Sequence, residues 1–97
     1  MKMKAVFDLV MKLLLEKQSL IGEIISVDMM KALILSRYKK EVDKRQIGRA
    51  LKTMGFYQEN INVVESPIIR RKSVYHLDKG IFDAAILKYV VKDIKEE

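Results

Sequence analysis

The sequence predicts a mainly helical domain with a small antiparallel β-hairpin, in the order α-(β)-α-α-β-β-α. Over much of the chain, apolar residues recur every three or four positions, which is the spacing of one helix face. After Gly55 the spacing changes to the alternation that is typical of extended strands. With 97 residues, the chain has the size of one domain, which we place at residues 1–97.

The composition excludes several classes of site. The chain has no cysteine, which rules out disulfides, thiolate zinc sites and cysteine nucleophiles. Charged residues interrupt every apolar stretch before it is long enough to span a bilayer, and Asp8 and Lys12 interrupt what would be the apolar part of a signal peptide. We therefore expect a cytoplasmic protein without membrane contact, metal or cofactor.

Helices are predicted near both ends of the chain, at residues 3–17 and 79–95. Val6 and Val10 recur at helical spacing in the first, and Asp78 is a candidate N-cap for the second. Both have a wider apolar arc than a surface helix needs. They could cover each other and the underside of the core. Alternatively, residues 3–17 and 79–95 pack against a second copy and form a two-fold homodimer.

Two helices joined by a tight turn are predicted within residues 26–55. We place them at 27–38 and 44–54, with Ser26 and Asp43 as N-caps, because the short polar side chains of Ser and Asp accept hydrogen bonds from the free amides of a first turn. The glycine that follows the second helix suits a left-handed C-terminal residue. This pattern predicts a helix-turn-helix unit.

The hairpin is predicted at residues 56–77. Extended segments at 56–64 and 69–77 flank a turn at 65–67, where a proline presets the backbone angle. A further short strand is expected at 23–25. The returning segment carries three consecutive basic residues just after the turn.

Positive charge is concentrated in one part of the sequence. The formal net charge is +6 and the sequence pI is about 9.6. Between residues 36 and 54 only Glu41 and Asp43 are acidic, against seven basic residues: Arg37, Lys39, Lys40, Lys44, Arg45, Arg49 and Lys52. A domain pI above 9 with clustered basic residues indicates nucleic-acid binding.

Helix 44–54 has one apolar and one basic face. Ile47 and Leu51 suit packing on the core, whereas Arg45 and Arg49 lie on the opposite side. Arginine can pair with guanine edges in the major groove, and both Arg and Lys neutralise phosphates. The alternative is an idle, solvated face. The position of this helix, second in the unit and followed by a basic hairpin, favours binding.

These patterns predict a set of DNA contacts. We expect Arg45 and Arg49 to lie nearest the bases of double-stranded DNA. The other predicted contact residues are Lys39, Lys40, Lys44, Gln46, Lys52, Thr53, Arg70, Arg71 and Lys72. Gly48 costs about 1 kcal/mol inside a helix relative to Ala. We expect a compensating close approach of another backbone, either from helix 27–38 or from nucleic acid.

A known family shares part of this pattern. The stretch Asp43-x-x-x-Ile47-Gly48-Arg49-Ala50-Leu51-Lys52-Thr53-Met54-Gly55-Phe56, followed by a basic strand ending Val74-Tyr75-His76-Leu77, resembles the C-terminal winged-helix module of phage, viral and plasmid primase-helicase replication proteins. The resemblance covers about residues 26–78. It implies a winged helix-turn-helix fold with the wing at 56–77, and contact with DNA or replication proteins. That family joins the module to an ATPase, whose phosphate-binding glycine loop this sequence lacks.

The sequence therefore favours a non-enzymatic binder of double-stranded DNA, acting as a transcriptional regulator or replication accessory protein. No pair of carboxylates suits acid–base catalysis, and His76 stands apart from any nucleophile. The main alternative is a protein-interaction module of a replication or transcription complex that docks through its apolar terminal helices. RNA binding is the third hypothesis. It is less favoured than the other two, because the sequence shows no evident aromatic surface on which bases could stack.

Overall fold

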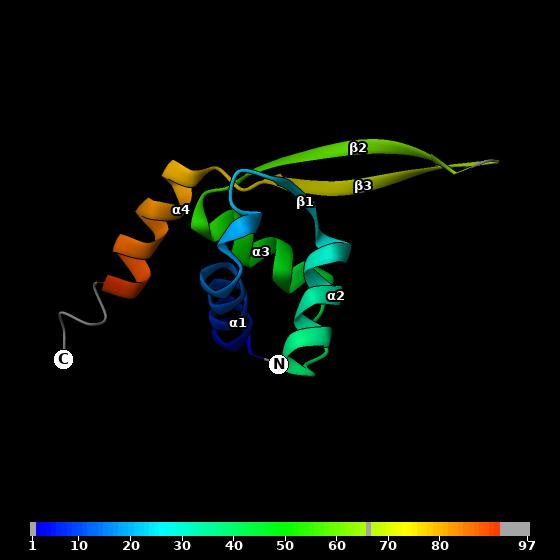
Figure 1. Cartoon of the computed structure of the whole chain (residues 1–97). Coiled ribbons are helices and arrows are strands. Elements are labelled where there is room, and N and C mark those ends of the chain that lie inside the picture. Colours follow the sequence, from blue (N-terminus) through cyan, green and yellow to red (C-terminus); the bar gives the residue numbers. More distant parts are fainter. Residues whose placement is uncertain (1, 66, 92–97) are drawn as a thin grey trace.

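The chain has a mixed α+β fold, as predicted (Figure 1). The computed structural model describes residues 2–65 and 67–91. Their elements are α1 (Met3–Glu16), β1 (Ile24–Ser26), α2 (Val27–Tyr38), α3 (Lys44–Met54), β2 (Tyr57–Glu65), β3 (Ile68–His76) and α4 (Lys79–Ile86). A 3-10 turn at Gln18–Leu20 follows α1, and a π-helical turn at Leu87–Val91 follows α4.

Local capping determines where three of the helices begin. The Ser26 hydroxyl accepts a hydrogen bond from the amide three residues on (3.1 Å), and the Asp43 carboxylate accepts one from the amide two residues on (2.7 Å). Asp78 accepts one from the amide three residues on (3.0 Å). Gly55 ends α3 with φ of 104°, a conformation that L side chains rarely adopt. The predicted bounds of α2 and α3 are therefore confirmed.

The three strands form an antiparallel sheet in the order β1-β3-β2. The β2–β3 hairpin is paired from Tyr57 opposite His76 to Glu65 opposite Ile68. Figure 1 shows that this hairpin extends as an arm beyond the helices, and the molecule measures 55 × 28 × 21 Å. Only the base of the arm joins the body, where Tyr75 is buried. Residue 66, in the predicted turn, lies outside the described residues.

The core lies between the helices and the base of the sheet. Val6, Val10 and Leu13 of α1 are fully buried, as are Ile47 and Leu51 of α3. Burying a Val or Leu side chain contributes about 1.5–3 kcal/mol to folding. The predicted apolar face of α3 is therefore confirmed, and its packing holds the opposite face of that helix toward solvent.

Helices lie near both ends of the chain, where they were predicted. The first ends at Glu16, one residue before the predicted limit, and the last begins at Lys79 and continues from an α-helix into a π-helical turn that reaches Val91. Residues 92–95 lie outside the described residues. The wider turn packs the Tyr89 ring edge-on to Phe7 with centroids 4.8 Å apart, while the Tyr89 hydroxyl donates to the carbonyl of Thr53 (3.4 Å). These contacts join the π-helical turn to α1 and α3.

Candidate functional site

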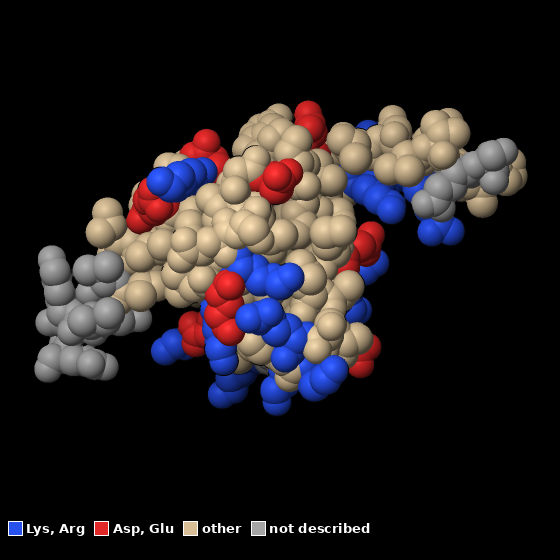
Figure 2. All heavy atoms as spheres, in the orientation of Figure 1, with Lys and Arg blue, Asp and Glu red and all other residues tan. Residues whose placement is uncertain are grey.

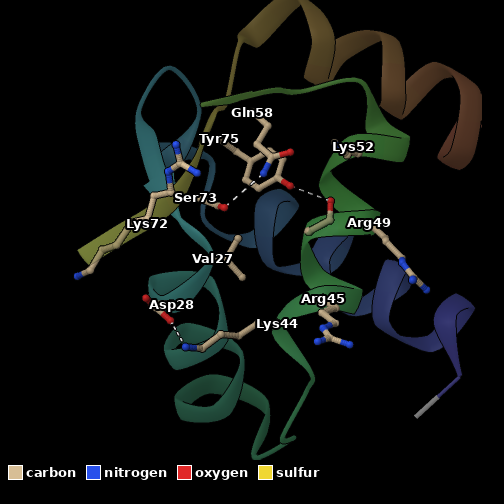
Figure 3. Close-up of a pocket in the computed structure, with 12 residues that line it drawn as sticks. Val27, Asp28, Lys44, Arg45, Arg49, Lys52, Gln58, Lys72, Ser73 and Tyr75 are labelled. Carbon is tan, nitrogen blue, oxygen red and sulfur yellow. Dashed lines mark hydrogen bonds and ion pairs between the residues drawn. The ribbon is translucent and has the colours of Figure 1, made fainter. Parts of the chain in front are cut away.

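An open groove of about 450 Å³ lies between the outer face of α3 and the base of the hairpin (Figure 3). Six basic side chains line it: Lys44, Arg45, Arg49, Lys52, Arg71 and Lys72. The other lining residues are Val27, Asp28, Gly48, Gln58, Ser73 and Tyr75. We call this feature the basic groove. Asp28 is the one carboxylate among its lining residues.

The α3 wall of the groove carries cations without acidic partners. Arg45, Arg49 and Lys52 are exposed, on the side of the helix opposite the buried Ile47 and Leu51. Within the part of the chain that the structure describes, none of these three cations forms an ion pair. Their charges are therefore available to an anionic ligand.

Lys44 at the start of α3 differs from these cations because it forms an ion pair with Asp28 of α2 (Figure 3). The hydrogen bond from Lys44 is the main cause of the lowered pKa of the Asp28 carboxyl, and the positive charges of Lys44, Lys72 and Lys31 lower this pKa further. The pair is exposed on both sides, so it stabilises the fold little. It does link the first turns of α2 and α3.

The hairpin wall presents a row of polar side chains toward the groove. Alternation along β3 places Arg71, Ser73 and Tyr75 on one face. The Gln58 amide donates to the Ser73 hydroxyl (3.3 Å), which donates to the Asn60 carbonyl oxygen (3.0 Å). Lys72 lies on the other face, and its side chain extends away from α3 at the edge of the groove (Figure 3).

Sequence reasoning missed the polar side chains of β2. The pattern that could have revealed them is the recurrence of Gln58, Asn60 and Asn62 at every second position. That spacing places amide side chains on one face of a strand. The register then sets Gln58 opposite Tyr75 and Asn62 opposite Arg71.

A contact between Gly48 and Tyr75 joins the two walls. The Tyr75 hydroxyl donates to the Gly48 carbonyl oxygen (3.2 Å), and a Cβ at Gly48 would lie 3.1 Å from that hydroxyl. The predicted approach of the backbone of helix 27–38 is therefore wrong, since the neighbour is a side chain from β3. Burial raises the pKa of the Tyr75 phenol. Glycine keeps the hairpin base close to α3.

Five predicted contact residues do not line the groove. Lys40 lies beside Ala5 and Asp8 on the α1 side, and Lys39 is the exposed residue at the C-terminal end of α2. Arg70 lies on the opposite face of the hairpin from Arg71, by strand alternation. The two remaining residues belong to α3. They are Gln46, which lies in a second shallow hollow with Glu41 and Asp43, and Thr53, whose hydroxyl donates to the Arg49 carbonyl (2.8 Å).

The basic residues are spread unevenly over the molecular surface. Figure 2 shows Lys and Arg gathered on the lower body and along the underside of the arm, whereas the upper surface in this view has few of them. Both basic regions lie on the same side of the molecule in this view. An extended polyanion could therefore contact both at once.

Within residues 2–65 and 67–91, His, Asp and Glu side chains form no group of three that could hold a metal ion. His76 pairs with Glu59 across the hairpin (Nε2 to Oε1, 3.3 Å). In the same described ranges, no helix combines the length and the apolar character needed to cross a bilayer.

Searches of known protein families, curated proteins and solved structures found no match to this chain. The basic groove is therefore characterised by its own residues alone.

Proposed function

We propose that the chain binds double-stranded DNA as a winged helix-turn-helix, with α3 in the major groove and the β2–β3 hairpin as the wing. The observation that carries the proposal is the basic groove itself. Side chains from α3 and β3 bring six cations to one open surface with a single carboxylate. Such a surface attracts a polyanion, and among the lining residues Asp28 is the one group that would repel it.

The dimensions and chemistry of α3 suit duplex DNA. A helix with its side chains is about 10–12 Å across, and the major groove of B-DNA is about 12 Å wide. Arg45 and Arg49 project from the outer face of α3 toward the base edges. Lys52 and Arg71 on the two walls contact phosphates on either side. Lys44 joins them once its pairing with Asp28 is exchanged for a phosphate.

The resemblance to replication modules suggests the cellular role. On this proposal the protein acts as a replication accessory protein or a transcriptional regulator. A homodimer through residues 3–17 and 79–95 would place two copies of α3 on successive turns of one duplex.

Salt dependence tests the proposal. Duplex DNA, single-stranded DNA and RNA of equal length are titrated with the protein at 50 and 200 mM salt, using fluorescence anisotropy. If the six basic residues neutralise six phosphates, log Kd for duplex rises with log salt with a slope of about 5, which is roughly a thousandfold weakening over this range. The duplex should bind more tightly than the other two ligands.

Two results would contradict DNA binding. One is an affinity for duplex that does not change with salt, and the other is no detectable binding at 50 mM. Either would favour the alternative, a module that docks a protein partner through apolar surface, because burial of apolar area depends little on ionic strength.

A further inference from the structure

The outer end of the hairpin carries exposed aliphatic side chains. Val64 is 74% exposed, Ile69 is 67% exposed and Ile68 is 54% exposed. Pro67 of the turn is also exposed. Single exposed apolar residues are common on protein surfaces, but several that lie together mark contact sites. We define the aliphatic tip as Val64, Pro67, Ile68 and Ile69.

The aliphatic tip continues the face of the hairpin that lines the basic groove. Val64 and Ile69 are directly opposite in the β2–β3 register. Ile69 is two residues from Arg71 and six from Tyr75, so all three lie on one face of β3. Moving outward from α3, this face therefore changes from polar to basic and then to aliphatic.

The length of the arm matches the spacing of the grooves in DNA. Six residues of antiparallel strand separate Tyr75, which contacts α3, from Ile69, a reach of about 20 Å at 3.4 Å per residue. One turn of B-DNA is about 34–36 Å, so half a turn is roughly 17 Å. With α3 in the major groove, the tip would reach the adjacent minor groove, and Arg71 would lie near the backbone between the two grooves.

We infer that the aliphatic tip inserts between base pairs in the minor groove and bends the duplex, an inference that rests on the proposed DNA binding. Proteins that insert apolar side chains such as Ile, Leu or Pro into base steps kink DNA by about 20–90°. The occupant is duplex DNA rather than a protein because Arg71 and Lys72, which complement phosphate, lie two and three residues after Ile69 of the tip. Within the described residues neither of these cations forms an ion pair with a carboxylate.

DNA bending and base unstacking test this inference. The probe is a 30-base-pair duplex with fluorophores at both ends, and a second duplex carries 2-aminopurine at successive positions. The wild-type protein should shorten the end-to-end distance and raise 2-aminopurine fluorescence at one step. The double variant Val64→Ser with Ile69→Ser should lose both signals while retaining salt-dependent binding. Ile24→Ser is the matched control, because Ile24 is 58% exposed but lies on β1, opposite His76 at the base of the arm and far from the tip, and it should bend DNA like the wild type.

Each contrary result has a distinct meaning. If the wild type binds duplex DNA without bending or unstacking it, the insertion of the tip is wrong but DNA binding stands. The same conclusion follows if the Val64→Ser and Ile69→Ser double variant bends DNA as much as the wild type. If the wild type does not bend DNA but forms a dimer that the double variant cannot form, the tip contacts a second copy of the chain. That result would also overturn the inference. Absence of any duplex binding would instead refute the proposed function. Circular dichroism melting of each variant verifies that the fold is retained.

Discussion

Two clusters in this molecule both combine Lys, Arg and Tyr side chains with one carboxylate, but they differ in how their charges are paired. The first is the basic groove. The second lies between α1 and α2 and consists of Lys12, Glu16, Arg37 and Tyr38, which we call the α1–α2 seam. There the Tyr38 hydroxyl and Arg37 (3.5 Å) both donate to the Glu16 carboxylate. The Lys12 ammonium lies 5.1 Å from the centre of the Tyr38 ring.

The seam pairs its charges internally, whereas among the described residues Lys44 is the one groove cation in an ion pair. The hydrogen bond from Tyr38 is the main cause of the lowered pKa of Glu16, and the charges of Arg37 and Lys12 lower this pKa further. In the groove, Asp28 is the one lining carboxylate for six cations. The two clusters therefore differ less in which basic residues they contain than in how many of these have an acidic partner.

The largest expected effect comes from removing groove cations. Arg45→Ala with Arg49→Ala should weaken duplex binding by about 1–3 kcal/mol per arginine, because each loses contacts to bases or phosphates. Arg37→Ala in the seam removes one positive charge at a similar exposure and should leave affinity nearly unchanged. Fluorescence anisotropy at 100 mM salt measures both. A loss for Arg37→Ala of about half that of the double variant would mean that affinity follows net charge and not the groove.

A smaller effect is expected at the junction of the two groove walls. Tyr75→Phe should destabilise the fold by about 0.5–1.5 kcal/mol, since it removes the hydrogen bond to Gly48. In the wild type, Gly48→Ala should be close to neutral, because a helix gain of about 1 kcal/mol is offset by crowding of the Tyr75 hydroxyl. In the Tyr75→Phe background the same change should stabilise.

Urea unfolding of the two single variants and the double variant measures this coupling. If their effects add within about 0.5 kcal/mol, the two residues do not interact and the proposed role of the hydroxyl is wrong.

The smallest expected effect concerns the carboxylate of each cluster. Asp28→Asn should strengthen duplex binding slightly at low salt, because it releases Lys44 and removes the one lining carboxylate. Glu16→Gln in the seam should leave affinity unchanged. Both partners of the Asp28 pair are largely exposed, so the loss of stability should stay below about 1 kcal/mol.

The pH dependence of the Asp28 variant follows from the direction of its pKa. Because folding lowers the pKa of Asp28, the pair stabilises the protein fully above the unfolded pKa of this group and is lost as the pH falls through the lower folded pKa. Wild type and Asp28→Asn should therefore converge in stability in acid. A difference that persists at pH 2 would assign the effect to packing and not to charge.

The sequence by itself determined the order of elements, the bounds of α2 and α3, and the division of α3 into an apolar and a basic face. These features depend on short-range physics. A cap is a hydrogen bond between a side chain and an amide two or three residues away, and face assignment depends only on helical periodicity. The sequence did not reveal that the last helix changes from α to π at Leu87, in the segment where Tyr89 contacts α1 and α3.

Only the tertiary structure decided which charges belong together. The hairpin register brings Arg71, but not Arg70, to the face that lines the groove with α3, and it places Tyr75 against Gly48 across 27 positions of sequence. Packing likewise set Arg37 beside Glu16 and placed Lys40 on the α1 side. Local sequence signals do not encode such pairings, because they arise when distant elements bury a common core and their outer faces meet as a consequence.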